Sequence, residues 1–398
     1  MNDAVIVDAV RTPAGKGKPG GQLSGVHPTE LLSEVLRVLV GRNDLDPALV
    51  DDVIAGCVGQ AGEQAMNIAR SAVLGAEFPE SVPATTIDRQ CGSSQQAASF
   101  AAQGVIAGAY DIVIACGVES MSRVPMGSPL QGRDPFGPGL AARYPDGLVN
   151  QGVSAELIAA RWKFDRETLD AYAARSHDRA AAAMESGAFA KEIIPVTAPG
   201  PDGDARVLTA DETVRPGTDT AGLAALRPSF ADEETGRRFP EIEDWRITPG
   251  NSSPLTDGAS AVLIMSEAKA AALGLRPLAR FHSFAVTGSD PLLMLTGVVP
   301  ATQKVLARTG LTIDDIDAYE VNEAFAPVPL VWQQELGADP ERLNPLGGAI
   351  ALGHPLGASG TRLLTTLVHH LRTTGGRYGL QTMCEGGGMA NATVIERI

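Results

Sequence analysis

The stretch Asp88-Arg-Gln-Cys91-Gly-Ser-Ser-Gln-Gln-Ala-Ala98 holds a single cysteine, and we expect the fold and the functional site to be organised around it. It follows a run typical of a β-strand, 84–88, and leads into a run of small residues, 97–108, that predicts a closely packed helix. We therefore expect Cys91 at or near a helix N-terminus, where unpaired N–H groups and the helix dipole favour the nucleophilic thiolate. The alternative is an inert buried thiol, because free cysteine is among the most buried residue types.

The segments around this stretch alternate between strand and helix patterns. Strands are predicted at 4–8, 53–55 and 111–116, and an amphipathic helix at 28–40. Helices that alternate with continuously apolar strands indicate an α/β fold with a largely parallel sheet covered on both faces.

The second half of the chain repeats this pattern. Residues 311–321 match 45–55, since both give a short loop, acidic residues and a strand. The helix at 357–372 corresponds to 92–108, and the strand at 378–383, followed by Cys384 and glycines, corresponds to 111–117. The simplest interpretation is a duplicated α/β unit, with the two halves packed face to face.

Residues 122–249 fit neither half. Their first part, 124–138, is rich in proline, glycine and arginine and predicts no regular structure. Ser154 is expected to cap a helix over 155–162, and Asp165 one over 166–186. We interpret the segment as an inserted domain. The division is then 1–121 completed by 250–275, the insert 122–249, and 276–398.

Composition narrows the classes of function. The chain has 398 residues and a formal net charge of −15, which argues against nucleic acid or an anionic membrane as a partner. No apolar run approaches the length of a membrane span, and no signal-type segment is recognisable at the start, so we expect a cytoplasmic protein. Free thiols are predicted, without a disulfide framework or zinc site, at the four unpaired positions Cys57, Cys91, Cys116 and Cys384.

Two polar clusters stand out in the C-terminal half. Asn322 and Glu323 directly follow a predicted strand, where ligand sites gather in α/β sheets, and for Glu323 we favour a structural role as a helix cap. His354 lies in the glycine-rich segment 347–360 and is held extended by Pro355. A satisfied core histidine is the alternative, but the glycines would let a ligand approach the backbone closely.

The third cluster is Cys384-Glu-Gly-Gly-Gly388, at the end of a strand. Three glycines there form a loop whose N–H groups can point at one spot and bind an oxyanion. Two cysteines and a histidine in such settings indicate nucleophilic acyl transfer with a separate acid–base group.

Together these motifs resemble the thiolase family of acetyl-CoA C-acyltransferases (3-ketoacyl-CoA thiolases) over essentially the whole chain. The resemblance is carried, in the family's order and spacing, by the segments around Cys91, 322–326, 353–355 and 384–388. The segments 89–96 and 381–388 look most like degradative bacterial members, including those of steroid-ring breakdown. The resemblance implies a thiolase-like fold, with two α/β halves in a layered αβαβα arrangement plus a loop domain that binds CoA.

The resemblance also implies residue roles. Cys91 would attack the 3-keto carbon of a 3-ketoacyl-CoA and become acylated. His354 would take the thiol proton, while Cys384 would protonate the acetyl-CoA enolate and then deprotonate incoming CoA. Asn322 would hold a water in the oxyanion hole beside His354. The N–H groups of Cys91 and Gly386 would form a second oxyanion hole.

CoA is implied as a substrate, with no prosthetic group and no metal. Ser253 occupies the family's pantetheine-contacting position, Arg215 lies where a basic residue often approaches the nucleotide, and Phe325 would wall the pantetheine channel. The chain departs from many members at Leu346, which bears on the loop that places His354. It also departs at Gln151, where short-chain synthetic members carry methionine and where a different acyl pocket is therefore expected.

Two other functions are compatible with parts of this pattern. A decarboxylating ketoacyl synthase of the same superfamily typically lacks a second catalytic cysteine, so the segment at Cys384 argues against it. A non-catalytic acyl-CoA or lipid carrier would not need the complete catalytic set. The resemblance further implies fatty acid β-oxidation or related lipid degradation, and a homodimer or homotetramer.

Overall fold

The computed structural model describes residues 3–200 and 204–398. In this part of the chain, ten strands form one mixed sheet and two more form a small hairpin. The main sheet contains β1 (Ala4–Arg11), β2 (Gly15–Lys16), β3 (Asp52–Gly56), β4 (Ala84–Ile87), β5 (Ile112–Ser120), β8 (Thr256–Ser266), β9 (Ala279–Gly288), β10 (Ala318–Val321), β11 (Tyr378–Glu385) and β12 (Met389–Arg397).

The sheet consists of two halves with the same order. The first runs β1-β8-β5-β3-β4 and the second β9-β12-β11-β10, after which an isolated parallel bridge from Tyr319 to Leu343 takes the place that β4 has in the first half. The halves join where β1 pairs with β9 over two residues, Val5 and Ile6. The predicted duplication is confirmed. The position of β8 between β1 and β5 also supports the proposed domain division, in which 250–275 completes the first half.

The prediction of a largely parallel sheet was wrong. Only the β3–β4, β3–β5 and β10–β11 pairs are parallel, whereas β1–β8, β5–β8, β9–β12, β11–β12 and β1–β9 are antiparallel. Parallel neighbours need a crossover connection, and helices do lie between the strands of each parallel pair. Strand β12 follows β11 through a tight turn, and β8 re-enters the sheet after the insert, so both run antiparallel to their neighbours.

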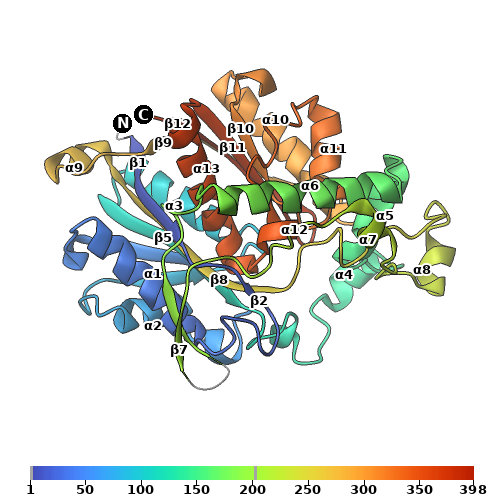
Figure 1. Cartoon of the computed structure of the whole chain (residues 1–398), viewed down its shortest axis with the longest axis horizontal. Helices are drawn as coiled ribbons and strands as arrows, with labels where there is room; N and C mark the ends of the chain where they lie inside the picture. The colour runs from blue at the N-terminus through green and yellow to red at the C-terminus, as the bar shows by residue number, and fades with distance from the viewer. Residues whose placement is uncertain (1–2, 201–203) are drawn as a thin grey trace.

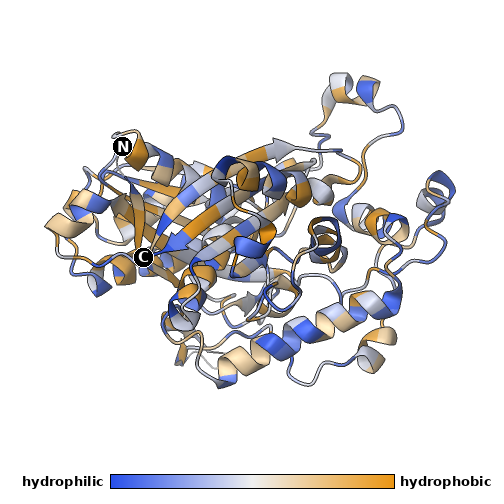
Figure 2. Cartoon of the chain, turned by 90° about the horizontal axis from the view of Figure 1, so that it is seen from above, coloured by the Kyte–Doolittle hydropathy of each residue, from blue (hydrophilic) through white to orange (hydrophobic). Residues whose placement is uncertain are grey.

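Helices cover both halves and also fill the space between them. On the first half's outer face lie α1 (Pro28–Arg42) and α2 (Ile68–Gly75), and on the second half's outer face α10 (Val298–Thr309) and α11 (Pro327–Leu336). The middle layer holds α3 (Ser93–Ile106) and α13 (Ser359–Thr374), which share one hydrophobic cluster with strands of both halves. Figure 1 shows the two halves side by side, and Figure 2 shows hydrophobic residues gathered on the central strands. The layered αβαβα arrangement is confirmed.

The segment between β5 and β8 lies across the edge of this core, with α6 in front of it (Figure 1). Its elements are α4 (Gly137–Arg143), α5 (Gln151–Arg161), α6 (Arg166–Glu185), the hairpin β6 (Val196–Pro199) and β7 (Ala205–Leu208), α7 (Thr220–Ala224) and α8 (Glu233–Arg238). The chain is completed by α9 (Glu267–Ala272) and α12 (Ala349–Leu352).

Local predictions for the insert had mixed outcomes. Asp165 does cap α6, accepting a 2.8 Å hydrogen bond from the Thr168 N–H. The Ser154 cap was wrong, because Asn150 caps α5 four residues earlier and Ser154 is buried inside the helix. The proline-rich lead-in is not wholly irregular either, since α4 begins within it. A glycine-proline pair suits a first helical turn, where the missing proline N–H has no intrahelical partner to lose.

No helix in residues 3–200 or 204–398 is long and apolar enough to cross a membrane.

Candidate active site

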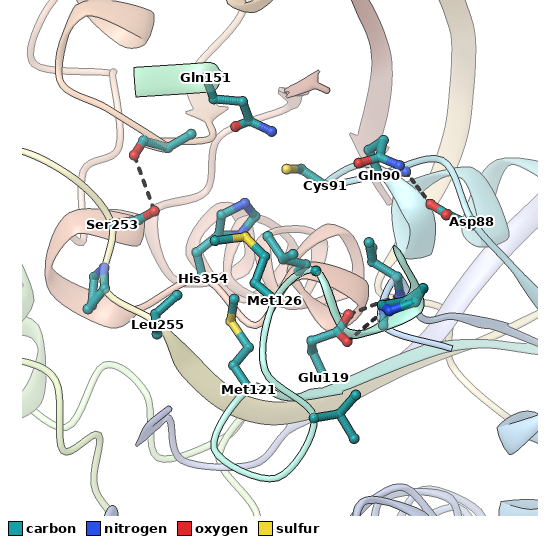
Figure 3. A pocket seen from close by; sticks show the side chains of 18 of the residues that line it. Asp88, Gln90, Cys91, Glu119, Met121, Met126, Gln151, Ser253, Leu255 and His354 are labelled. Carbon is teal, nitrogen blue, oxygen red and sulfur yellow. Dashed lines mark hydrogen bonds between the residues drawn. The ribbon is translucent and has the colours of Figure 1, made fainter. Parts of the chain in front are cut away.

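A pocket of about 360 Å³ opens where the two halves and the insert meet. Figure 3 shows the Cys91 thiol and the His354 ring directed into it from opposite sides. Its lining comes from the turn before α3, the loop after β5, the start of α5 and the segments around 254, 324 and 355. These residues are Val58, Gly59, Asp88, Gln90, Cys91, Glu119, Met121, Val124, Met126, Gly127, Pro129, Leu130, Gln151, Ser253, Pro254, Leu255, Ala324, Phe325, His354 and Leu356.

Cys91 lies two residues before the first residue of α3, as the sequence predicts. The turn that carries it is tight. Gln90 has a left-handed backbone with φ of 48°, and the N–H groups of Gly92 and Ser93 donate back to the carbonyls of Arg89 and Gln90. A non-glycine residue in this conformation is uncommon and clusters at functional sites, where the surrounding structure holds it in place.

The expectation that the resting cysteine favours the thiolate was wrong. Burial, together with the nearby Glu385 carboxyl, raises the pKa of Cys91 to about 12. The desolvation of a 4% exposed thiol raises its pKa by more than the backbone hydrogen bond at Cys91 lowers it. Cys91 is therefore a thiol at rest, and a reaction that uses its sulfur as a nucleophile would need a base to remove the proton.

His354 lines the same pocket as Cys91. It lies in the loop between α12 and α13, as predicted, and its backbone N–H donates to Thr256 Oγ1 at 2.9 Å. Ser359 Oγ is 2.5 Å from the His354 Nδ1 atom and itself donates to the Pro355 carbonyl at 2.9 Å. Because the Ser359 hydroxyl gives its proton to that carbonyl, its oxygen accepts from the ring. Nδ1 therefore carries the ring proton, and Nε2 carries the lone pair.

The environment keeps this histidine neutral. Burial and the positive charge of Arg362 lower the pKa of His354 to about 3. Its Nε2 atom lies 3.3 Å from Asn322 Nδ2, which can donate to it. The Asn322 Oδ1 atom is buried and accepts no hydrogen bond from the described residues. A neutral imidazole whose Nε2 atom carries the lone pair can accept a proton from a thiol when that thiol takes the place of the Asn322 donor.

Cys384 is the second-last residue of β11, and Gly386 follows the strand directly; neither is among the residues that line the pocket. Cys384 is fully buried, and its pKa is raised well above the ordinary value by burial and by the negative charge that Cys91 and Glu385 would carry. The two thiols are therefore near neighbours. A Cβ on Gly386 would lie 3.1 Å from Gln90 Oε1 and 3.2 Å from Gln151 Nε2, which places Gly386 at the pocket edge.

Close contact between backbone segments of the two halves brings these groups together. The carbonyl oxygen of Gly357 packs against Gly117, and a Cβ on Gly357 would lie 2.6 Å from the Gly56 carbonyl. Glycine is required at these positions because any side chain would separate the halves. Glu119 links them as well, since its carboxylate accepts the Gly357 N–H at 2.9 Å and N–H groups of the 58–59 loop.

Glu323 has the structural role we favoured, though not as the cap of the helix that follows it. The first helix after it, α11, has Ala326 at its N-cap position, with no side-chain capping bond. The buried Glu323 carboxylate accepts hydrogen bonds from Tyr172, Ser176, the Asn344 side chain and the N–H of Ile350 in α12. It therefore ties α6 of the insert to the loops that lead to His354.

The residues expected to contact CoA are not all at the pocket. Ser253 lines it and is fixed to the Ala324 carbonyl by its N–H at 3.0 Å and its hydroxyl at 3.2 Å. Phe325 also lines it, packed edge-to-face on Phe230 with ring centroids 6.1 Å apart. Arg215 does not line the pocket. Its side chain is exposed, and its backbone N–H donates to His177 Nδ1 on α6.

The two departures are accommodated differently. Leu346 packs half-buried against the apolar cluster of α6 and α12, so this loop is held by hydrophobic contact. Gln151 lines the pocket with its side chain (Figure 3).

From the sequence, the lead-in from Val124 to Leu148 was expected to form part of the acyl pocket, but the side chains of the apolar wall were not identified; they include Met121, Val124, Met126 and Leu130. Sequence reasoning also missed Ser359, Glu119 and Arg362. A signal existed for Ser359, because a hydroxyl five residues after a histidine, at the start of a helix, can reach back to the ring. The loop residues gave no such signal, since their side-chain directions depend on irregular backbone.

Comparison with known proteins supports this assembly. The family model described as "Thiolase, N-terminal domain" matches residues 4–268, and "Thiolase, C-terminal domain" matches residues 275–397. A steroid 3-ketoacyl-CoA thiolase of Mycobacterium tuberculosis is 48% identical over 407 residues, which cover 100% of this chain and 95% of the relative. A 3-ketoacyl-CoA thiolase of Serratia proteamaculans is 46% identical, with 100% of both chains covered.

Two family models together span nearly the whole chain, and the two relatives are covered over 95% and 100% of their length. The chain belongs to the thiolase family.

Proposed function

We propose that this protein is an acetyl-CoA C-acyltransferase. It cleaves a 3-ketoacyl-CoA with CoA into acetyl-CoA and a shortened acyl-CoA, and it catalyses the reverse Claisen condensation. The observation that carries the proposal is the meeting of Cys91 and a neutral His354 at one pocket, with the buried Cys384 thiol close enough to Cys91 for their charges to interact. A second thiol beside the nucleophile favours this reaction over that of a ketoacyl synthase, and the match to both thiolase domain models agrees.

In the first half-reaction, the Cys91 thiol gives its proton to His354 Nε2 as the sulfur attacks the 3-keto carbon. The C2–C3 bond then breaks, and its electron pair passes to the thioester carbonyl as an enolate. Cys384 donates its proton to the enolate carbon, which releases acetyl-CoA and leaves an acyl-thioester on Cys91. His354 and a water held by Asn322 Oδ1 stabilise the enolate oxygen.

In the second half-reaction, the Cys384 thiolate removes the proton of incoming CoA. The CoA sulfur attacks the acyl carbon, and Cys91 leaves as a thiolate that recovers its proton from His354. The N–H groups of Cys91 and Gly386 stabilise the tetrahedral oxyanion, where losing one donor typically costs about a hundredfold or more in rate. Both thiols return to their starting protonation state, so no further acid or base is consumed.

The pantetheine arm is proposed to pass between Ser253 and Phe325, which line the pocket on the side of the insert. Arg215 stays a candidate for the nucleotide end only, since it lies outside the pocket. The acyl group would then occupy the apolar side formed by Met121, Val124 and neighbouring residues of the same loop.

The relatives named above are a steroid 3-ketoacyl-CoA thiolase and a 3-ketoacyl-CoA thiolase. We infer a role in degrading fatty-acyl or steroid-derived CoA thioesters in the cytoplasm. We also propose a homodimer or homotetramer. The strand β4, last in the described sheet and partly exposed, supports this by offering an edge for a second copy.

The proposal is tested by following acetyl-CoA release from acetoacetyl-CoA and a longer 3-ketoacyl-CoA in the presence of CoA. Cys91→Ala is expected to lower the rate by at least about a thousandfold. Cys116→Ala, which removes a core thiol outside the pocket, is the matched control and should retain most of the activity. A folded Cys91→Ala protein with the original rate would overturn the proposal, and acyl-CoA binding by the original chain without acetyl-CoA release would indicate a carrier.

A further inference from the structure

Glu385 is a buried carboxyl that the reaction above does not use. It follows Cys384 at the end of β11, and its relative exposure is 0%. One of its oxygens packs directly against the Cα of Gly92, the residue after the nucleophile, so that a Cβ there would overlap it. Gly92 has an ordinary φ of −86°, so glycine is needed at this position for space and not for backbone conformation.

Neither oxygen of Glu385 has a hydrogen-bond partner among the described residues. The contrast with other buried glutamates near the pocket is sharp. Glu119 is 2% exposed and accepts hydrogen bonds from three backbone N–H groups and the Gln64 side chain. Glu323 likewise accepts four. An ionised carboxylate needs such donors when it is buried, whereas a protonated carboxyl costs much less to bury.

The charged and titratable groups around Glu385 come from the turn before α3 and from β11. Arg89 favours its ionised form, Asp88 opposes it, and the Cys91 and Cys384 thiols complete the set. From β12, the neutral Asn391 side chain approaches the same Gly92 position, and it donates to the Gly92 carbonyl. Burial dominates and raises the pKa of Glu385 to about 8.

We propose that Glu385 is a positioning residue that holds a proton at the start of α3 and that, on losing this proton to solvent, opposes ionisation of Cys91. An ionised Glu385 would neutralise the positive end of α3, the same end that would otherwise stabilise the Cys91 thiolate. Its negative charge acts on Cys384 in the same direction. The protein therefore couples one buried carboxyl to both of its reacting thiols.

This proposal rests on the proposed function only in treating Cys91 as the reacting thiol. The test uses alkylation of Cys91 by iodoacetamide, followed by mass spectrometry of its peptide from pH 6 to pH 10, and needs no substrate. A failure here would leave the acyltransferase assignment standing, while loss of that assignment would leave the alkylation result readable.

In the original protein, the alkylation rate is expected to rise less than tenfold per pH unit between about pH 7 and pH 9, because Glu385 ionises there. In the Glu385→Gln variant, the alkylation rate of Cys91 should rise by the full tenfold per pH unit. The ratio of variant to original should be near one below pH 7 and reach about tenfold by pH 9. Glu80→Gln, an exposed carboxyl far from the pocket, is the matched control and should follow the original profile.

A second variant guards against a folding defect in the first. Arg89→Gln removes the cation that favours ionised Glu385. The pH range in which the alkylation rate rises less than tenfold per unit should therefore move to higher pH. Superimposable profiles for Glu385→Gln and the original protein, or a ratio that is the same at every pH, would overturn the proposal. If Glu385→Gln does not fold, an Arg89→Gln profile identical to the original would overturn it.

Discussion

The carbonyl oxygen of Gly357 packs directly against the Cα of Gly117, at the point where the two halves of the chain meet. Gly117 belongs to β5 of the first half, and Gly357 lies three residues after His354 in the second. This contact, together with the Glu119 bond to the Gly357 N–H, fixes the loop of His354 against the half that carries Cys91.

Gly117→Ala should therefore impair both stability and activity. A Cβ at 117 would overlap the Gly357 oxygen and would lie 2.8 Å from the Ser94 side chain, and neither is a flexible chain end. We expect a loss of about 2 to 4 kcal/mol in unfolding free energy, measured by urea denaturation, and a fall in kcat. Gly139→Ala, with open space around its Cα, is the control. Wild-type stability for Gly117→Ala would contradict this account of how the halves meet.

Ser359→Ala tests the assignment of the ring proton. Without the hydroxyl, nothing holds the proton of His354 on Nδ1, so the base form of Nε2 is less populated and the ring less fixed. We expect kcat to fall by about 10- to 100-fold with KM within about threefold. Thr373→Ala removes a hydroxyl from the far end of the same helix and should leave kcat unchanged. Equal kcat values for the two variants would refute the proposed tautomer.

Glu320 gives a prediction for stability as a function of pH. It is buried in β10, and burial raises its pKa to about 8 despite the nearby Arg362. The folded form binds the Glu320 proton more tightly than the unfolded chain does. The contribution of this group to the free energy of unfolding is therefore fully present below about pH 4.5 and is lost as the pH rises toward 8. Glu320→Gln should therefore gain stability relative to the original protein by about 3 to 5 kcal/mol over this range.

The measurement is urea denaturation of both proteins at pH 5, 6.5 and 8. A difference in unfolding free energy that does not change with pH would show that Glu320 ionises as readily in the folded state as in the unfolded chain.

Met126 tests the position of the acyl group. Its side chain lines the pocket but is 66% exposed, so a larger residue there should narrow the pocket without disturbing the core. For Met126→Trp we expect kcat/KM for a long or ring-bearing 3-ketoacyl-CoA to fall about tenfold, with that for acetoacetyl-CoA within about twofold. An equal loss for both substrates would place the CoA arm, and not the acyl group, beside Met126.

Much of the fold and site could be predicted from the sequence because the duplication gives each pattern twice. Cys91 before α3 and His354 before α13 follow from glycine-marked helix starts, and Cys384 follows from a strand that ends in glycines. The strand directions could not be predicted in the same way, since a buried strand has the same apolar pattern whichever way its neighbours run.

The protonation state of the Cys91 thiol could not be predicted from the sequence either. The helix N-terminus that follows Cys91 is a local feature of the sequence. The burial of the thiol depends on tertiary packing, and the carboxyl of Glu385 belongs to a segment almost three hundred positions away. The Ser154 cap failed for a related reason, because Asn150 offers the same capping chemistry one turn earlier and only the tertiary structure decides between them.

The central claim is that Cys91 carries the acyl group, and the most direct measurement is mass spectrometry of the protein after incubation with a 3-ketoacyl-CoA in the absence of free CoA. The account predicts a mass increase equal to the shortened acyl group, located on the Cys91 peptide, removed by added CoA and absent from Cys91→Ala. No mass increase, or an acyl group on Cys384 or any other residue, would contradict it.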